Sequence, residues 1–394
     1  MGGRIMASTI NADTSNGVII TPDTSGEIEL QANGVTKAKV TANGLQDANG
    51  NSLRGGMYRN LVINGDMQIA QRGTSATGLG NGSAGYHTAD RWRFSETGAP
   101  TCEFTQSQDT DVPNGQGFSS SLKMDCTTSQ GSLAAADQIK IEQRIEAQNL
   151  QHLKFGTSNA ETVTVSFWVK SNKTGTYILN IYQADDDRSI SKSYTINSAD
   201  TWEKKTITIE GDVLGTINND NGLGWYVIWA LAMGSDYTSG TLQTSWGAYT
   251  AANYMVGQVN LADSTSNYIN ITGVQLEVGE GASDFEFLPY DVQLQRCQRY
   301  YYQVDSYGFI NMTTNVYNGT IVKFPVSMRA TPTCTLYSTT TGTSGKIYYQ
   351  DGATDVNAGA SPASGTEAVY ARVSNVSTNT GSNMFFKITA SSEL

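Results

Sequence analysis

Histidine, the most frequent general base of enzymes, is scarce in this chain. His87, in "GYHTAD", and His152, in "LQHLK", are its only two imidazoles. No serine lies in the GxSxG turn that exposes the nucleophile of many Ser-His-Asp hydrolases. The stretch "TGTSGK" lacks the GxxxxGK[ST] spacing of a phosphate-binding loop. The sequence therefore predicts a protein that is not an enzyme.

Two acidic clusters, "QADDDRS" and "EVGEGASDFE", offer carboxylates. Their members are Asp185, Asp186, Asp187, Glu277, Glu280, Asp284 and Glu286. Solvated loops are the favoured interpretation of both clusters. The alternatives are a calcium site, since hard cations bind carboxylate and carbonyl oxygens, and a pair of glycosidase carboxylates. "INNDNG" lacks the distal Glu of an EF-hand loop. We expect no bound metal and no cofactor.

Exposed aromatic rings could serve a different chemistry, because a flat ring stacks on the apolar face of a sugar. Trp168 is a candidate since it shares the polar face of "TVTVSFWVKS" with Ser166 and Lys170. Tyr182 lies beside Asn180 on the next expected strand. The alternative is that loops or another subunit cover this face.

Further aromatic candidates lie in expected loops and in the last part of the chain. They are Trp246 and Tyr249 in "TSWGAYT", and Tyr348, Tyr349 and Tyr370 near the end. Tyr side chains supply adaptable contact area at low entropic cost. The last three could equally belong to a core. Trp225 and Trp229, in the apolar run "GWYVIWALAM", are expected to be core residues.

Composition limits the fold and the partners. A length of 394 residues suggests two or three domains, and 40 Gly, 20 Tyr and 15% charged residues are typical of an all-β protein. The net charge of −11 disfavours nucleic acid as a partner. The sequence contains no run of about 18 apolar residues, so we expect no membrane-spanning segment. The N-terminal residues lack the apolar core of a secretory signal. Four scattered cysteines (Cys102, Cys126, Cys297 and Cys334) indicate reduced, buried thiols.

Residues 1–55 read as a polar segment that needs a partner, which could be copies of itself, another protein, or both. Within it, "GEIELQANGVTKAKV" predicts a hairpin with a three-residue loop, which places Glu29 opposite Lys37. The apolar face, with Ile28, Leu30 and Val40, is too small for a hairpin to fold alone. We therefore expect these three residues at a subunit interface. A partly disordered leader is the alternative.

Residues 56–289 read as a central jelly-roll β-sandwich. "TVTVSFWVKS" and "GTYILNIYQA" form a hairpin around the turn "NKTG", and "TWEKKTITIEGD" is a further strand. In "NYINITGVQLEVG" the apolar phase slips by one residue at Gly273, which predicts a β-bulge.

Residues 290–303 read as a short connecting helix, and residues 304–394 as a smaller β domain. In "DVQLQRCQRYY", Leu294, Cys297 and Tyr301 share one helical face, with Asp291 as a plausible cap. A helix this short is marginal alone. Its apolar face must pack on neighbouring domains or on other copies of the helix, and we assign it to the subunit interface.

Several stretches together resemble bacteriophage tail fibres and related virion host-attachment proteins. They are "NLVINGDMQIAQRGTS", "TADRWRF", "ITGVQLEVGEGASDFEFLPYDVQLQRCQRYYYQ" and "FPVSMRATPT". The leader "MASTINADTSNGVIITPDTSGEIELQANG" is similar to virion-proximal segments of such fibres, including those of phages that infect cyanobacteria. The middle part resembles the jelly rolls of carbohydrate-binding modules. Trp92, Arg93 and "GVQLEVG" match as framework positions.

The resemblance implies a homotrimer in the virion tail, assembled in the host cytoplasm. Its N-terminal part would bind phage tail or adaptor proteins, and its C-terminal domains would face the host. The function we expect is adsorption to a host surface polysaccharide, such as lipopolysaccharide, without cleavage. The alternatives are a glycan-degrading tailspike and a purely structural virion or baseplate component.

Overall fold

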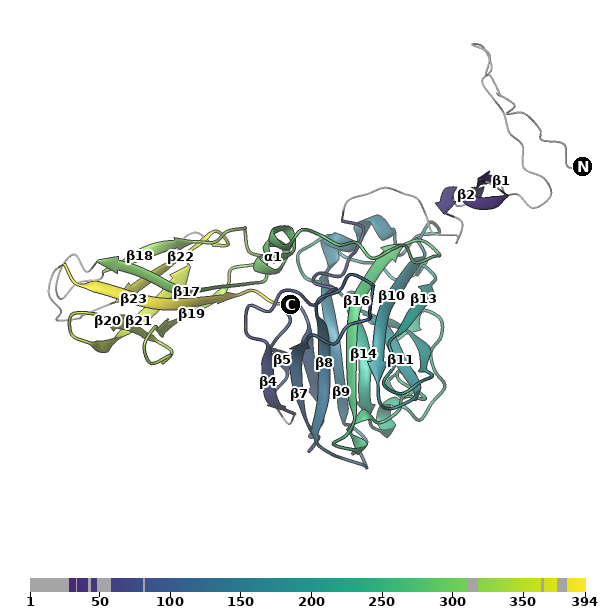
Figure 1. Cartoon of the computed structure of the whole chain (residues 1–394), viewed down its shortest axis with the longest axis horizontal. Coiled ribbons are helices and arrows are strands. Elements are labelled where there is room, and N and C mark those ends of the chain that lie inside the picture. Colours follow the sequence, from purple (N-terminus) through teal and green to yellow (C-terminus); the bar gives the residue numbers. More distant parts are fainter. Residues whose placement is uncertain are drawn as a thin grey trace, which may run out of the picture.

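The protein is built almost entirely of β-strands, as the sequence predicts. The computed structural model describes residues 28–32, 34–41, 44–47, 58–80, 82–310, 318–362, 365–373 and 381–394. Figure 1 shows a large central β-sandwich, a smaller β unit on the other side of helix α1, and a small N-terminal sheet. The all-β fold class is therefore confirmed. Most of the proposed attachment segment, residues 1–27 and 48–55, lies outside the described residues.

The N-terminal sheet has three strands, β1 (Ile28–Ala32), β2 (Val35–Thr41) and β3 (Gly44–Asp47). The hairpin exists, but the expected register is wrong. Ala32 pairs with Val35, and Glu29 pairs with Lys39 rather than with Lys37. The pairing shifts between Leu30 and Gln31. Because of this shift, a hairpin with a short turn still pairs Leu30 with Ala38 and Ile28 with Val40 on one apolar face.

The central sandwich consists of two sheets. The six-stranded sheet has the order β13-β10-β16-β8-β7-β4. Its strands are β4 (Ser75–Leu79), β7 (Glu103–Asp109), β8 (Ser121–Thr128), β10 (Val163–Ser171), β13 (Glu203–Ile209) and β16 (Tyr268–Val278). The seven-stranded sheet has the order β15-β12-β11-β14-β9-β6-β5. Its strands are β5 (Gly85–Tyr86), β6 (Arg93–Thr97), β9 (Gln138–Glu146), β11 (Gly175–Gln183), β12 (Arg188–Ile196), β14 (Leu223–Met233) and β15 (Gly247–Ala248). Short 3₁₀ helices η1 (Ala147–Leu153), η2 (Ser235–Tyr237), η3 (Ala251–Asn253) and η4 (Leu261–Asp263) lie in the connections.

The core lies between the two sheets and follows the period-two pattern of the strands. The alternating apolar residues of β10, such as Val165 and Phe167, are fully buried. Trp225 and Trp229 on β14 are also fully buried, which confirms that they are core residues. The ring of Trp229 lies 5.3 Å from that of Trp92, so the core joins distant parts of the chain.

The bulge expected in β16 is present. The pairing of β10 with β16 shifts between Ser166 and Trp168, opposite Gly273. Gly273 has a φ of +60°, and a Cβ there would lie 2.5 Å from the ring of Phe118. The bulge needs glycine for both reasons. It keeps Ile271 and Val274 both in the core although the strand changes phase.

Helix α1 (Tyr290–Gln298) is shorter than predicted. Residues 301–303 are not helical, because Tyr301 pairs with Ser391 and begins strand β17. The cap is also corrected: Pro289 occupies the N-cap position, and no side chain caps the helix. Proline suits this position because its fixed φ and missing N–H suit the start of a helix. None of the described helices is long and apolar enough to cross a membrane.

The C-terminal β unit follows α1. Its strands are β17 (Tyr301–Ile310), β18 (Asn318–Lys323), β19 (Thr333–Ser338), β20 (Lys346–Tyr349), β21 (Thr354–Pro362), β22 (Ala368–Val373) and β23 (Asn383–Ser391). They pair in the order β17-β23-β20-β21-β22-β18, and β19 also pairs with β23. The strand-like runs "GTIVKFPVSM", "TPTCTLYST", "GKIYYQ", "AVYARVSN" and "NMFFKITA" predict β18, β19, β20, β22 and β23, whereas no such run predicts β17 or β21.

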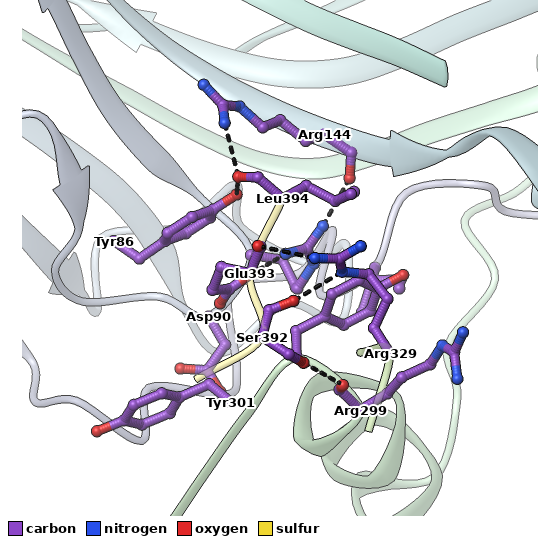
Figure 2. Close-up of polar contacts among 12 residues, drawn as sticks. Tyr86, Asp90, Arg144, Arg299, Tyr301, Arg329, Ser392, Glu393 and Leu394 are labelled. Carbon is purple, nitrogen blue, oxygen red and sulfur yellow. Dashed lines mark hydrogen bonds and ion pairs between the residues drawn. The ribbon is translucent and has the colours of Figure 1, made fainter. Parts of the chain in front are cut away.

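The residues after β23 join the two β units. Glu393 forms ion pairs with Arg91 and, at 3.0 Å, with Arg72. The guanidinium carbons of Arg72 and Arg91 lie 3.6 Å from the ring centroids of Tyr301 and Tyr300. One carboxylate and two stacked cations therefore connect β23 with the central sandwich. We call residues 392–394 with these partners the junction (Figure 2).

Backbone contacts reinforce the junction. Figure 2 shows Arg144 and Tyr86 reaching the backbone oxygen of Leu394, and Ser392 reaching the backbone oxygen of Arg299. The Arg144 Nη1 donates to that Leu394 oxygen at 2.6 Å.

Two further contacts connect the region after α1 to the sandwich. Arg299 donates to both carboxylate oxygens of Glu146 at 2.9 and 2.8 Å, and the Tyr300 hydroxyl donates to the same carboxylate. Arg329 exchanges backbone and side-chain hydrogen bonds with Asn221.

Candidate functional site

A groove on the outer face of the seven-stranded sheet gathers aromatic and charged side chains. Its volume is about 320 Å³. The lining residues are Ser95, Gln138, Lys140, Glu142, Arg144, Tyr182, Tyr226, Ile228, Tyr249 and Tyr254. Strands β6, β9, β11 and β14 form the floor of the groove. Successive side chains of a strand point to opposite faces of the sheet, so every second side chain of these strands points away from the core. We call this site the groove.

Pairing between strands lines up the floor of the groove. Tyr182 on β11 lies opposite Tyr226 on β14, and Tyr226 lies opposite Arg144 on β9. The next row carries Ile228 opposite Glu142. Residues in register on one face of a sheet are neighbours. The tyrosines of β11 and β14 therefore lie directly beside the charged residues of β9.

Four tyrosines form one side of the groove. The Tyr182 ring lies 5.6 Å from Tyr226 and 5.5 Å from Tyr249, both edge to face, and Tyr249 lies 5.2 Å from Tyr254. Burial, with the nearby acid Asp187, raises the pKa of Tyr182, and burial raises that of Tyr249 to about 12. The hydroxyls are therefore neutral at physiological pH and can both donate and accept hydrogen bonds.

The tyrosines are held by the chain that follows β14. Residues of this segment, including Tyr254 and Met255, pack on Ile178 and Ile228 at the outer face of the sheet and form a second small core. The Tyr249 N–H donates to the backbone oxygen of Asp187 at 2.9 Å, and the Tyr182 hydroxyl donates to the Asp187 carboxylate at 2.6 Å. The connection between β11 and β12 thus fixes two rings of the groove.

Charged residues form the other side of the groove. The Glu142 Oε1 accepts hydrogen bonds from Arg93 at 3.0 Å and from the Arg144 Nε at 2.9 Å. The side chain of Glu142 is only 1% exposed, and its Oε2 has no hydrogen-bond partner. The Arg144 guanidinium also lies 4.8 Å from the Tyr226 ring centroid.

Lys140 is the cation with the weakest contacts in the groove. Its Nζ lies 3.5 Å from the Gln138 Oε1, 3.8 Å from the Glu142 Oε2 and 5.9 Å from the Tyr254 ring centroid. Only 14% of its side chain is exposed. Burial lowers the pKa of Lys140 below its ordinary value, and Glu142 partly opposes that effect. An ion partner from outside would therefore be favourable at this position.

The structure brings two of the predicted sugar-binding aromatics together, Tyr182 and Tyr249. Trp168 is half-buried on the outer face of the other sheet, on the opposite side of the sandwich. Trp246 packs on Phe155 and Trp225 and donates from its ring nitrogen to the Glu210 backbone oxygen at 2.7 Å. Trp246 lies in the loop before β15, as predicted, but its ring is half-buried and packs against the central core.

The three candidates in the C-terminal unit do not line the groove. Tyr349 is buried in the core of that unit and is not available to a ligand, which corrects the prediction. Tyr348 and Tyr370 are half-buried on β20 and β22.

The residues assigned to the subunit interface divide into two groups. Cys297 is fully buried and Tyr301 is 7% exposed, and both side chains are covered within the single chain. Leu294 packs on the same small cluster as Cys297. The assignment of Cys297 and Tyr301 to an interface between copies is therefore wrong, whereas the half-buried Leu294 remains a predicted interface residue. Ile28, Leu30 and Val40 remain predicted interface residues.

The first acidic cluster has structural partners. Asp185 accepts hydrogen bonds from the backbone and side-chain amides of Asn218, and Asp186 accepts one from the Thr216 N–H. In the second acidic cluster, Glu286 accepts hydrogen bonds from the backbone N–H groups of Tyr58 and Asn60. Among the residues that the structure describes, no group of three or more His, Cys, Asp or Glu could hold a metal ion.

The sequence identified only two of the ten residues that line the groove, Tyr182 and Tyr249. Tyr226, Tyr254, Lys140, Glu142 and Arg144 were not singled out. A signal existed on β9, where "QIKIEQRIE" alternates apolar residues with Lys140, Glu142 and Arg144. A strand with one apolar and one charged face lies at the surface, but its neighbours in the sheet cannot be deduced from that pattern.

Comparisons with known proteins show partial likeness of fold. No protein-family model matches the chain, and no curated protein matches it. Among solved structures, the enzymatically active domain of bacteriophage CBA120 tailspike protein 4 is similar at a TM-score of 0.32 and 17% identity, over 56% of this chain and 22% of that one. The MgGH51 α-L-arabinofuranosidase is similar at a TM-score of 0.29 and 14% identity, over 57% of this chain and 27% of that one.

A CBM4 structure is similar at a TM-score of 0.28 and 13% identity, over 55% of this chain and 98% of that one. This chain thus spans about a quarter of the first two structures and nearly all of the third. Because all three TM-scores lie below 0.5, the likeness carries no argument about function. The assignment of an all-β sandwich rests on the sheets themselves.

Proposed function

We propose that this protein binds a glycan chain in the groove and does not cleave it. The observation that carries the proposal is the aromatic row of Tyr182, Tyr226 and Tyr249 beside the polar row of Ser95, Lys140 and Glu142. Rings can cover the apolar faces of sugar rings, and the neighbouring donors and acceptors can bond their hydroxyl groups. Concave surfaces with aromatic walls and a few fixed polar groups are typical small-molecule sites.

Binding without cleavage is supported by the carboxylates. Glycoside hydrolysis usually needs two carboxyl groups on either side of the scissile bond. Glu142 is the only Asp or Glu among the described residues that line the groove, and two arginines already bond one of its oxygens. Neither His87 nor His152 lines the groove.

We further propose that the chain is a homotrimeric tail fibre located in the virion. Support comes from the N-terminal sheet, whose Leu30 and Val40 are 48% and 39% exposed in the single chain. A small sheet with exposed apolar residues needs a partner to be stable. Copies of the same chain would provide one, and phage tail or adaptor proteins would bind the residues before them. The host surface polysaccharide would be the ligand of the groove.

The binding proposal is tested with Tyr249→Ala and Tyr182→Ala in the full-length protein. Truncation of a central aromatic contact costs more than about 1 kcal/mol, so affinity for purified host lipopolysaccharide should fall by roughly tenfold. Trp168→Ala on the opposite sheet is the matched control and should bind as the wild type does. Equal binding by all variants would remove the groove from the proposal.

Cleavage and assembly are tested separately. Incubation with the same polysaccharide should release no oligosaccharides, and their appearance would instead favour a glycan-degrading tailspike. No binding at all would favour a structural virion component. Light scattering should give the mass of three chains, and a monomer would exclude the fibre.

A further inference from the structure

We infer that the groove selects an acidic glycan, and that Lys140 is the residue that binds the carboxylate of one sugar unit. This inference rests on the proposed glycan binding and adds the chemical class of the ligand. It is carried by the charge balance of the groove, by the contacts of Lys140 and by the position of Lys140 beside the tyrosines.

The charge balance leaves one cation without an equivalent anion. The lining includes Lys140 and Arg144 against the single carboxylate of Glu142. Arg93, on the neighbouring strand, donates to the same Glu142 oxygen as Arg144 does. The two guanidinium groups therefore already bond the Oε1 of Glu142. Three cations thus surround one carboxylate, and Lys140, at 3.8 Å from Oε2, is the one without a hydrogen bond to it.

The contacts of Lys140 agree with this reading. An ordinary N⁺–H···O⁻ hydrogen bond is about 2.7–2.9 Å long, whereas the ammonium group has polar contacts at 3.5 and 3.8 Å. At 14% exposure the side chain has lost much of its water. A ligand carboxylate would restore the hydrogen bonds and the opposite charge that a buried ammonium group requires.

The position of Lys140 suits a sugar acid rather than a free anion. Ser95 lies directly opposite Lys140 on β6, and Tyr254 lies on its other side. A sugar ring against the tyrosines would direct its carboxylate to Lys140 and a neighbouring hydroxyl to Ser95. Asp187, bonded to the Tyr182 hydroxyl, lies at the far end of the aromatic row. The negative charge of the ligand therefore belongs at the Lys140 end.

The positive charge of Lys140 in the groove contrasts with the net negative charge of the whole chain. The whole chain has a formal net charge of −11. General attraction of polyanions is therefore disfavoured, so an acidic glycan would bind only where the groove offers a specific cation. Binding should weaken with salt, as expected for a partly exposed ion pair.

The test is a glycan array that presents hexuronates and their parent hexoses as matched pairs, applied to the full-length protein. We expect the wild type to bind at least one uronate about tenfold more tightly than its parent hexose, and Lys140→Gln to lose that preference. Lys140→Arg should keep it. Lys123→Gln is the matched control, because Lys123 lies on the six-stranded sheet and its removal changes the net charge equally.

The outcomes separate the inference from the proposed function. Equal binding of both members of each pair, or an acid preference that survives Lys140→Gln, overturns the inference and leaves glycan binding in place. Binding of no glycan by the wild type overturns both. Loss of the preference in both Lys140→Gln and Lys123→Gln would attribute it to overall charge and would also overturn the inference.

Discussion

Glu393 is expected to hold the C-terminal β unit against the central sandwich. Its carboxylate is paired with Arg91, which is 1% exposed, and with Arg72, which is 13% exposed. Glu393→Ala would leave the Arg91 guanidinium buried beside the Tyr300 ring, with the Arg144 backbone oxygen as its remaining hydrogen-bond partner. Removal of one member of a buried ion pair costs about 3–5 kcal/mol.

The two arginines do not contribute equally to that cost. Arg72 keeps Asp90 as a second partner at 3.6 Å, so most of the penalty comes from Arg91. We therefore expect the lower part of the range, about 3 kcal/mol, which corresponds to a change of more than a hundredfold in an equilibrium constant. The free energy of unfolding in urea should fall by that amount. Limited proteolysis should cut earlier between residues 279 and 300.

The double variant Arg91→Met, Glu393→Ala is the control, because it leaves no unpaired buried charge. It should recover a large part of the lost stability. If Glu393→Ala unfolds within about 0.5 kcal/mol of the wild type, a typical change for a surface substitution, the junction does not depend on this pair and the reasoning is refuted.

Three further predictions concern pH, backbone and assembly. Burial raises the pKa of Asp90 to about 6, so the folded protein binds a proton at Asp90 more tightly than the unfolded chain does. This contribution to stability is present at low pH and is lost as the pH rises through about 6. The free energy of unfolding should therefore decline from pH 4 to 7 by up to about 3 kcal/mol more in the wild type than in Asp90→Asn. Gly273→Ala should destabilise by about 2–4 kcal/mol from its left-handed φ and the contact with Phe118, whereas Gly342→Ala, with a φ of +69° and open space around it, should cost only about 1–2 kcal/mol by the same denaturation assay. Leu30→Ser should lower the mass seen by light scattering from three chains toward one, while an unchanged mass would place the interface elsewhere.

Local patterns in the sequence were sufficient to predict individual strands. The alternation around Val165 and Phe167 predicts which face of β10 is buried, and the phase slip at Gly273 predicts the bulge, because both depend on the period of two within one strand. Strand β21 was missed because "TDVNAGASP" has neither alternation nor β-branched density. Tyr301 was assigned to the helix because the helical period continues past Gln298, whereas pairing with β23 decides its conformation.

The groove could be predicted only in part, since its residues come from strands far apart in the sequence. Tyr182 was found because its strand shows one polar face. Tyr226 was not, because β14 is apolar on both faces and its outer face is covered only partly by the chain that follows it. Trp246 was correctly placed in a loop, but its contacts with Phe155 and Trp225 could not be predicted, because those residues lie far away in the sequence.

Strand β9 constrains how ligand preference could change during evolution. One face of this strand carries Lys140 and Glu142 in the groove and then Glu146, which holds Arg299. Arg144 belongs to both regions, because it contacts Glu142 and the Leu394 backbone oxygen. Replacement of Arg144 would therefore alter recognition and loosen the attachment of the C-terminal unit together. Lys140 contacts no residue of the junction, so a change of charge at this position of the proposed site would leave the attachment of the C-terminal unit intact.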